Sequence, residues 1–310
     1  MRVLTGRRPR FHAPSRAVVT VGVFDGVHHA HQRLVRSTVR LARRMRGTSV
    51  VVTFDPDPQA VLDPEHAPPA LMPLEARLAR LRELGIDGVW IIPFTKPFAR
   101  IQANAFVHQL LIGRLHAAAL IVGETFAFGR GRRGNMRLLR RVGPVAGMRI
   151  VSVKEVRSGG APISSSRIRR LIAEGRLAAA RRLLGRPPEL YGTVVTGAGR
   201  ARRLGFPTAN IRLRASTLPP RGVYAVRLRL GARAPIPGVM NLGVRPTFGP
   251  GPLVCEVHLL GFSGRLTGRS VSVSLLGRLR GERCFPSSQA LVRQVRRDIQ
   301  RARRLFSRSR

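Results

Sequence analysis

Hydrophobic and polar residues alternate in two ways along the chain. From residue 17 to about 156, short runs rich in β-branched apolar residues are separated by segments in which Leu, Ala and Arg recur three and four positions apart. The first kind of run predicts strands and the second predicts amphipathic helices, which together indicate a parallel sheet covered by helices. We expect strands at 18–21, 49–54, 88–93, 119–123 and 148–153, and helices at 31–46, 74–84 and 103–115.

The pattern changes from residue 191, where β-rich runs are short and separated by Gly- and Pro-rich turns. Such runs predict an antiparallel barrel or sandwich. We expect strands at 191–196, 222–230, 238–242, 253–260 and 270–276, and a final helix at 288–305. A helical stretch at 163–185 ends before Pro187 and Pro188. We therefore expect two domains, 1–185 of α/β class and 186–310 of β class.

Length and composition favour a globular protein. The 310 residues, 44% of them hydrophobic, can build two separate cores. No apolar run approaches the roughly 20 residues of a membrane-spanning helix, and the basic first residues do not lead into a signal-peptide apolar region. We expect a cytoplasmic protein without a membrane partner. Cys255 and Cys284 are too few for a disulfide framework and lack metal-ligand spacing, which indicates reduced thiols.

The formal net charge of +41 raises the question of nucleic-acid binding. Lysine occurs only at Lys96 and Lys154, while arginines are scattered through nearly every predicted helix, and aromatic residues make up only 5% of the chain. A surface that tracks phosphates would interleave a basic patch with stacking aromatics. We therefore expect no specific nucleic-acid partner, although a basic nucleic-acid-associated protein is the non-enzymatic alternative.

The turn after the first predicted strand carries the first candidate chemistry. Residues 22–31 read Gly-Val-Phe-Asp-Gly-Val-His-His-Ala-His. Ligands of open parallel sheets bind at such turns, and a following helix offers free N–H groups to an anion. His28 and His31 can donate hydrogen bonds to a phosphoryl group during transfer. A metal site and plain polar loop residues are alternatives, although zinc would need a further ligand.

Two other segments of the first half also suit phosphates. Gly129, Gly131 and Gly134 alternate with arginines in a cationic loop, which is either a polyphosphate site or a glycine-rich surface loop. Ser165 and Ser166 stand where a helix begins. Serines there cap the helix, and the same free donors bind phosphate, so the two interpretations are compatible.

Together these segments resemble a known family. Residues 22–31 are similar to the His-x-Gly-His signature of nucleotidyltransferases, in the form typical of bacterial bifunctional riboflavin kinase/FAD synthetases. The resemblance continues through 53–58, 122–129 and 163–169. It implies a Rossmann-like nucleotidyltransferase domain with FMN adenylyltransferase activity, in which the FMN phosphate attacks the α-phosphate of ATP and releases FAD and pyrophosphate.

The resemblance also assigns residues. It implies that His28 and His31 stabilise the reacting phosphate. The nucleotide-binding positions that it implies are Gly22, Phe24, Asp25, Gly26, Gly123, Phe128, Gly129, Ser165, Ser166 and Arg169. Three positions depart from the family pattern: Ala30 replaces a glycine, Asp57 a histidine, and Thr125 an aspartate or asparagine. Alanine replaces glycine at little cost where φ is negative and at a high cost where φ is positive.

The second half resembles riboflavin kinase. Residues 204–210, Leu-Gly-Phe-Pro-Thr-Ala-Asn, are similar to its signature, which implies that Thr208 and Asn210 hold Mg²⁺ while Gly197, Gly205 and Pro207 contact ATP. Residues two apart in an extended segment point to the same side, as ligands of one hard cation must. The resemblance continues at 220–226 and 241–249, where it implies flavin contacts for Asn241, Arg245 and Thr247.

A carboxylate stands in the next element, at residues 255–260. Glu256 and His258 share one face of a predicted strand. On the residues alone, Glu256 is either functional or a solvent-facing partner of an arginine. By resemblance it is the general base that takes the proton of the riboflavin 5′-hydroxyl as this attacks the γ-phosphate of ATP. The family pattern continues through 279–287 to Leu291, Gln294 and Asp298.

We therefore expect a bifunctional enzyme that phosphorylates riboflavin to FMN and adenylylates FMN to FAD, with ATP as co-substrate and Mg²⁺ as cofactor. A riboflavin kinase with an impaired adenylyltransferase domain is the main alternative, because of Ala30, Asp57 and Thr125. The sequence predicts no oligomeric state.

Overall fold

The computed structural model describes residues 1–6, 16–197, 199–214, 216–231, 233–244 and 253–307. The chain forms two compact units, one of residues 1–68 with 74–165 and the other of residues 69–73 with 166–310. The domain boundary expected at residue 185 stays a prediction, because compactness does not show which segments fold independently.

The first unit is built on a parallel sheet. Its strands are β1 (Arg2–Thr5), β2 (Ala17–Val21), β3 (Thr48–Asp55), β4 (Gly88–Pro93), β5 (Ala117–Gly123) and β6 (Arg149–Val153), with a separate pair β7 (Arg157–Ser158) and β8 (Ala161–Pro162). The six sheet strands are parallel in the order β1-β4-β3-β2-β5-β6. The five predicted strands are confirmed, whereas β1 was not predicted. The strand order reverses beside β2, which makes the turn after β2 the ligand-binding position expected of such sheets.

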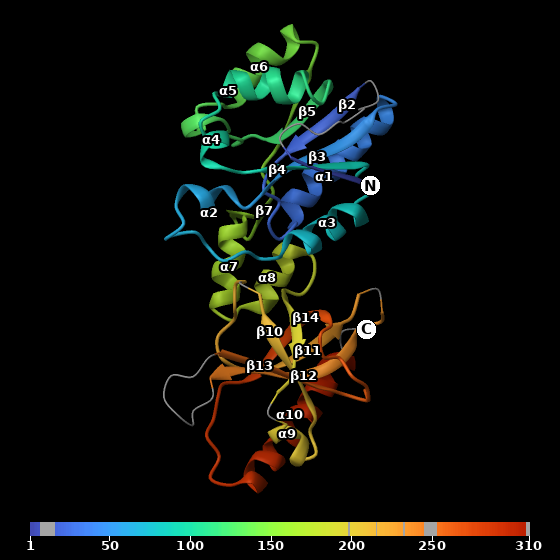
Figure 1. Cartoon of the computed structure of the whole chain (residues 1–310), viewed down its shortest axis with the longest axis vertical. Helices are drawn as coiled ribbons and strands as arrows, with labels where there is room; N and C mark the ends of the chain where they lie inside the picture. Colours follow the sequence, from blue (N-terminus) through green and yellow to red (C-terminus); the bar gives the residue numbers. More distant parts are fainter. Residues whose placement is uncertain (7–15, 198, 215, 232, 245–252, 308–310) are drawn as a thin grey trace. The chain divides into compact units, whose positions relative to one another are not determined.

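Helices cover both faces of this sheet (Figure 1). They are α1 (His29–Arg44), α2 (Pro58–Leu62), α3 (Leu74–Glu83), α4 (Lys96–Ala99), α5 (Ala103–Ala105), the π-helix η1 (Phe106–Ile112), the 3₁₀-helix η2 (Arg130–Arg132) and α6 (Met136–Val145). Val51 of β3 packs with Val35 of α1 and Leu81 of α3, while its neighbour Val50 belongs to the opposite cluster with Leu111 of η1. Because successive residues of a strand face opposite sides, both faces of β3 are buried.

The second unit is a closed antiparallel barrel with helices outside it (Figure 1). Its strands are β9 (Glu189–Val195), β10 (Thr208–Leu213), β11 (Gly222–Arg229), β12 (Ile236–Val244), β13 (Leu253–Leu259) and β14 (Ser270–Arg280). They close in the order β10-β13-β12-β11-β14-β9. The helices are α7 (Ser165–Ala173), α8 (Leu177–Leu184), α9 (Arg200–Arg203) and α10 (Ser288–Ser307). The predicted barrel and terminal helix are confirmed.

The two faces of β13 show how the barrel is organised. Cys255, Val257 and Leu259 are buried in the barrel core, while Glu256 and His258 between them are only half-buried and face outward. Burial, together with the nearby Glu256 charge, raises the pKa of the Cys255 thiol to about 12, so this thiol is neutral. The alternation therefore places the predicted base on the outside of the barrel.

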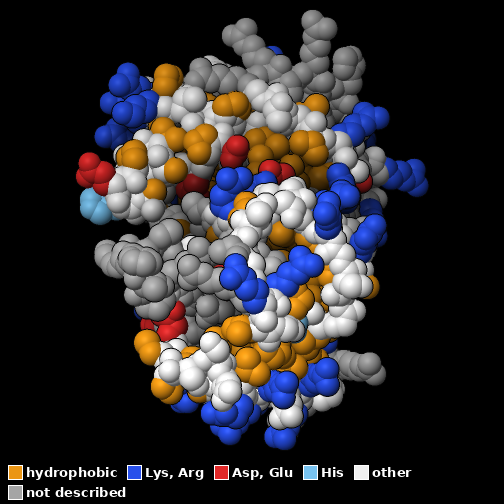
Figure 2. All heavy atoms as spheres, turned by 60° about the horizontal axis from the view of Figure 1, so that its bottom comes forward, with side chains coloured by type: hydrophobic (Ala, Val, Ile, Leu, Met, Phe, Trp, Pro, Cys, Tyr) orange, Lys and Arg blue, Asp and Glu red, His pale blue; other side chains and the backbone are white. Residues whose placement is uncertain are grey.

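The surface is basic but not patchy on the face that Figure 2 shows. Its Lys and Arg side chains are scattered among apolar and uncharged ones. None of the helices in the described part of the chain has the length and apolarity needed to span a bilayer.

Candidate active sites

The turn after β2 has an unusual backbone. Phe24, Gly26 and Val27 have φ values of 56°, 80° and 39°. Positive φ is uncommon for residues with a side chain and costs free energy unless the surroundings hold it. Here Phe24 and Val27 are each 1% exposed, so their packing fixes the turn. The turn leads directly into α1.

Two histidines stand at the start of α1 and contact each other. His28 is the N-cap residue, and its Nδ1 accepts a hydrogen bond from the backbone N–H of His31 at 3.4 Å. The two imidazole rings stack, with centroids 3.6 Å apart and planes 18° from parallel. The Phe24 ring meets the edge of His31 at 5.1 Å. The structure therefore brings together the two histidines that the sequence selected.

The surroundings of His31 keep its ring neutral. Burial is the main cause of a pKa well below the usual 6.5, and positive charge at His28 and Arg77 lowers this pKa further. The Nδ1 atom of His31 is buried and has no hydrogen-bond partner among the described residues. At neutral pH, one ring nitrogen thus carries a proton that it can donate, and the other can accept.

Other predicted residues surround this turn to different degrees. Asp25 is 5% exposed, and its carbonyl accepts a hydrogen bond of 2.9 Å from the Ser165 hydroxyl. Gly123 ends β5, the strand beside β2. Gly22 continues the sheet, since its N–H donates to the Val52 carbonyl. Ser165 thus contacts the turn directly, and Gly123 ends the strand that pairs with β2. Both residues lie close to the turn.

Phe128 and Gly129 have clear packing roles. The Phe128 ring is 8% exposed and contacts Phe106 and Phe126, with centroids 5.4 and 5.3 Å away. Gly129 has φ of 70°, and a Cβ there would lie 2.7 Å from the Cα of Ala103. Both residues thus shape the loop, and their nucleotide contacts stay a prediction.

Ser166 and Arg169 belong to the second compact unit. Arg169 is half-buried, and its Nε donates to the Pro69 carbonyl at 2.9 Å. Their contact with ATP phosphates stays a prediction.

The three departures from the family pattern differ in their consequences. Ala30 lies in the first turn of α1 and is not among the residues with positive φ, so its methyl group strains no backbone. Asp57 caps α2, because its Oδ1 accepts from the N–H of Gln59 at 2.9 Å. Nothing in the structure explains Thr125. Position 57, where the family has a histidine, therefore carries an aspartate that caps a helix.

The second candidate site is a row of polar side chains on the outside of the barrel. Glu256 of β13 lies directly opposite Asn210 of β10 on one side and opposite Asn241 of β12 on the other. Thr208 lies opposite His258. Residues directly opposite each other in a sheet share a face, so this row gathers the predicted base, both predicted metal ligands and one predicted flavin contact.

The segment before β10 is fastened to the row. His258 Nδ1 forms a hydrogen bond of 2.9 Å with the Pro207 carbonyl, and its ring meets the edge of Phe206 at 5.6 Å. A Cβ at Gly197 would lie only 2.0 Å from Nδ2 of Asn210. Glycine at position 197 therefore leaves the space that the Asn210 amide occupies. The sequence placed His258 on the face of Glu256 but did not assign it this contact.

A buried ion pair supports the same unit. Asp298 of α10 is 1% exposed and accepts hydrogen bonds of 2.9 Å from Arg280 Nε and from Gln294 Nε2. The sequence pattern included all three residues but gave them no role. The spacing of Gln294 and Asp298, one helical turn apart, could have predicted their hydrogen bond.

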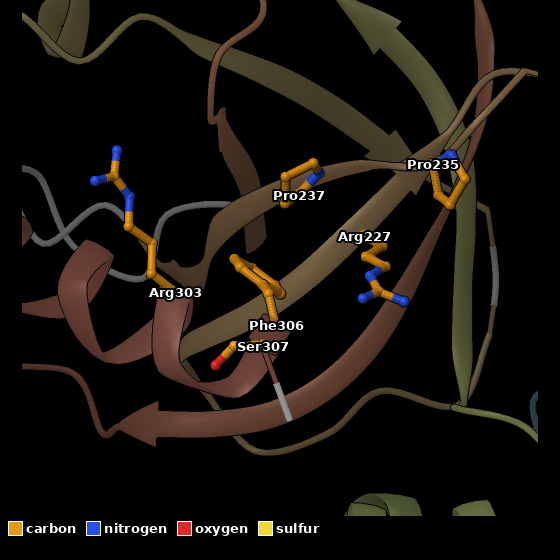
Figure 3. Close-up of a pocket in the computed structure, with 6 residues that line it drawn as sticks. All are labelled: Arg227, Pro235, Pro237, Arg303, Phe306 and Ser307. Atoms are coloured by element: carbon orange, nitrogen blue, oxygen red, sulfur yellow. The ribbon is translucent and has the colours of Figure 1, made fainter. Parts of the chain in front are cut away.

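Two predicted flavin contacts, Arg245 and Thr247, lie outside the described residues. A pocket of about 600 Å³ opens elsewhere on the unit, where the end of α10 meets the barrel (Figure 3). It is lined by Arg227, Pro235, Pro237, Arg303, Phe306 and Ser307. None of the predicted site residues lines it.

Family models match both halves of the chain. The FAD synthetase model matches residues 11–167, and the riboflavin kinase model matches residues 184–306. These are the halves that contain the histidine turn and the polar row, respectively. Together the two models cover most of the chain.

Known proteins match the chain over nearly its full length. The bifunctional riboflavin kinase/FMN adenylyltransferase of Escherichia coli is 38% identical, with 99% of this chain and 98% of the relative covered. That of Haemophilus influenzae is 35% identical, with 93% and 94% covered. A solved structure from Streptococcus pneumoniae, described as a macrolide-efflux protein, is 29% identical with a TM-score of 0.88, covering 98% and 99%. The chain therefore belongs to the family of bifunctional riboflavin kinases/FMN adenylyltransferases.

Proposed function

We propose that this chain makes FMN from riboflavin on its barrel and FAD from FMN at its histidine turn, with ATP as the second substrate of both reactions. The observation that carries the proposal is the row in which Glu256 lies between Asn210 and Asn241 on the outside of the barrel. The names of the relatives and the two family models support both activities.

Glu256 is the base of the kinase reaction. Its carboxylate takes the proton of the riboflavin 5′-hydroxyl, whose oxygen bonds to the γ-phosphorus of ATP while the bond to the β-phosphate oxygen breaks and ADP leaves. Asn241 lies beside Glu256 on the same face and positions the flavin. A general base of this kind contributes about 10²- to 10⁴-fold to the rate.

Thr208 and Asn210 suit a magnesium ion. The described residues contain no group of three or more His, Cys, Asp and Glu side chains that would hold a metal by themselves. Mg²⁺ takes few protein ligands, prefers oxygen and completes its shell with phosphates and water, so one hydroxyl and one amide oxygen fit it. When bound, the ion neutralises charge on the phosphates of ATP. Gly197 has no Cβ and so leaves room for the Asn210 amide.

His28 and His31 act in the adenylylation reaction. An oxygen of the FMN phosphate attacks the α-phosphorus of ATP, and pyrophosphate leaves. The neutral ring of His31 donates a hydrogen bond to the developing charge, and His28 stands beside it at the N-terminus of α1. The first turn of α1 contains no acidic residue, so the positive end of the helix is left for the phosphates.

The partners are thus riboflavin, FMN and ATP. Because ATP and free flavins are met in the cytoplasm, we place the protein there. We propose no nucleic-acid partner, since the basic side chains are spread among others on the face seen in Figure 2.

One assay tests the proposal. The purified chain is incubated with riboflavin, ATP and Mg²⁺, and separately with FMN, ATP and Mg²⁺, and the flavins are separated by chromatography. We expect FMN and then FAD in the first mixture and FAD in the second. If FMN forms but FAD does not, only the kinase activity is supported. If a folded chain forms no FMN and no FAD, both proposed activities are contradicted.

A further inference from the structure

Arg77 is a buried arginine that neither reaction above uses. It belongs to α3 and is only 6% exposed, one helical turn before the fully buried Leu81. Arginine is almost never fully buried unless it is paired. The burial of Arg77 therefore indicates a role other than keeping the surface of α3 soluble.

The guanidinium of Arg77 joins the histidine turn to the neighbouring strand. Its Nη1 donates to the Val23 carbonyl at 2.5 Å, and its Nη2 donates to the Phe54 carbonyl at 3.3 Å. Nη1 also lies 3.4 Å from the hydroxyl of Thr53, which itself donates to the Val23 carbonyl at 3.0 Å. Val23 is in the turn after β2, and Phe54 is near the carboxyl end of β3. One rigid fork thus spans both.

The charge of Arg77 has no direct counter-ion in the described part of the chain. Among the described residues, no carboxylate forms an ion pair with it, and its buried Nε has no hydrogen-bond partner. Burial lowers the pKa of Arg77, and the charges of Asp25, Asp55 and Asp57 raise it in part. The group keeps its charge, because an arginine side chain does not lose its proton in a protein at neutral pH. A buried cation without an ion-pair partner creates a positive potential around itself.

We propose that Arg77 is a positioning residue of the adenylylation site: it fixes the turn of residues 22–28 against β3 and supplies positive potential behind the place where the phosphates react. This inference rests on the proposed FMN adenylyltransferase activity. The titratable and charged groups around the turn are His28, His31, Asp25, Asp55, Asp57 and Arg77, and Arg77 is the buried guanidinium of this set.

The test compares three variants of the full chain. Arg77→Met removes donors and charge, Arg77→Lys keeps the charge without the fork, and Arg82→Met on the exposed face of α3 is the matched control. We measure kcat/KM for ATP in FAD formation against pH. The kinase reaction of the same chain reports on general damage.

We expect Arg77→Met to lower kcat/KM for ATP in FAD formation by about 10- to 100-fold, since a small misplacement of reacting groups has effects of this size. The limb of the pH profile that belongs to His31 moves to higher pH, because a positive charge that lowers the pKa of His31 is gone. Arg77→Lys keeps this limb in place but loses activity. The kinase reaction and the Arg82→Met variant stay at the wild-type level.

The proposal is overturned if Arg77→Met forms FAD at the wild-type rate and the His31 limb of its pH profile does not move. If Arg77→Met leaves the first unit unfolded, Arg77→Lys decides: a fall of more than about threefold supports the role, and a smaller change refutes it. If the wild-type chain forms no FAD at all, the proposed function has failed. The inference about Arg77 is then tested without turnover, by NMR titration of His31, whose pKa should rise in Arg77→Met.

Discussion

The two sites are built in opposite ways. At the proposed adenylylation site, charged and titratable groups are buried: His28 is 3% exposed, Asp25 5% and Arg77 6%. At the proposed kinase site, Glu256 and Asn210 are half-buried on the outside of the barrel, and Asn241 is exposed. The first site is held by side chains that are kept from water, and the second by the pairing of three strands.

This difference predicts how each site fails. Burial and the positive charges of His28 and Arg77 lower the pKa of His31, so the proposed adenylylation site should respond to pH and to charge substitutions. The polar row depends on register, because a slip of one residue would turn Glu256 into the barrel. The proposed kinase site should therefore respond most to the loss of the Glu256 carboxylate and to changes that disturb the barrel.

The largest effect should come from Glu256→Gln. The amide keeps the size of the side chain but cannot take a proton, so FMN formation should fall by about 10²- to 10⁴-fold. Adenylylation of supplied FMN by the same protein should be unchanged, which controls for folding. Kinase turnover within a few-fold of the wild type would remove Glu256 from the role of base.

Asp298→Ala should have the next largest effect, on stability. It leaves Arg280 without its partner in a place where the two side chains are 10% and 1% exposed, and breaking such a pair costs about 3–5 kcal/mol. Gln294→Ala removes one hydrogen bond and should cost only about 1 kcal/mol. Denaturation followed by circular dichroism measures the loss. Trp90, the single tryptophan, lies in the first unit. Its fluorescence should therefore report an unchanged unfolding transition of that unit.

The sequence predicted most of the fold because both periodicities were strong. It missed β1, whose residues are mostly exposed at the edge of the sheet and show no apolar pattern. It predicted one helix over 103–115, where the structure has α5 followed by the π-helix η1. Local propensity does not distinguish a π-helix from an α-helix, because the difference is one residue in hydrogen-bond spacing.

The candidate sites were predicted where a motif is continuous in sequence, as at His28 and His31. Arg77 was not predicted, because one arginine in a chain with 56 basic residues resembles a solvated helix face. Its burial arises only when α3 packs against the ends of β2 and β3. The contact of His258 with Pro207 likewise depends on strand pairing between segments some 50 residues apart.

Acidification should weaken the first unit through His31. Its folded-state pKa lies below the usual 6.5, so below about pH 6.5 the unfolded chain binds a proton that the folded chain does not. Stability is therefore full above pH 6.5 and falls as the pH decreases below it. His31→Gln should reduce this pH dependence, and His29→Gln, an exposed neighbour, should not. Urea unfolding followed by Trp90 fluorescence at pH 7.5 and 5.5 measures it; identical slopes in all three proteins would contradict the assignment.

Gly197→Ala should affect magnesium use more than stability. The new Cβ would lie 2.0 Å from Nδ2 of Asn210, and because this is the end of a side chain, the amide can move away at little cost to the fold. If the Asn210 amide holds the ion as proposed, its displacement should raise the Mg²⁺ concentration for half-maximal kinase activity about tenfold, which corresponds to about 1.4 kcal/mol. The Mg²⁺ dependence of adenylylation in the same protein should stay as in the wild type. An unchanged kinase requirement would separate Asn210 from the metal.

Ala30→Gly should have the smallest effect and bears on the buried site alone. Ala30 lies in the first turn of α1 without positive φ, so glycine relieves no backbone strain and costs the helix about 0.5–1 kcal/mol. If the methyl group meets the nucleotide, its removal should raise kcat/KM for ATP in FAD formation by a few-fold at most, since only one methyl contact is lost. Steady-state rates with FMN and ATP measure this, and kinase rates are the control. A fall in FAD formation would show that the rigid helix start, with His28 and His31 fixed upon it, matters more than the space that the methyl group takes.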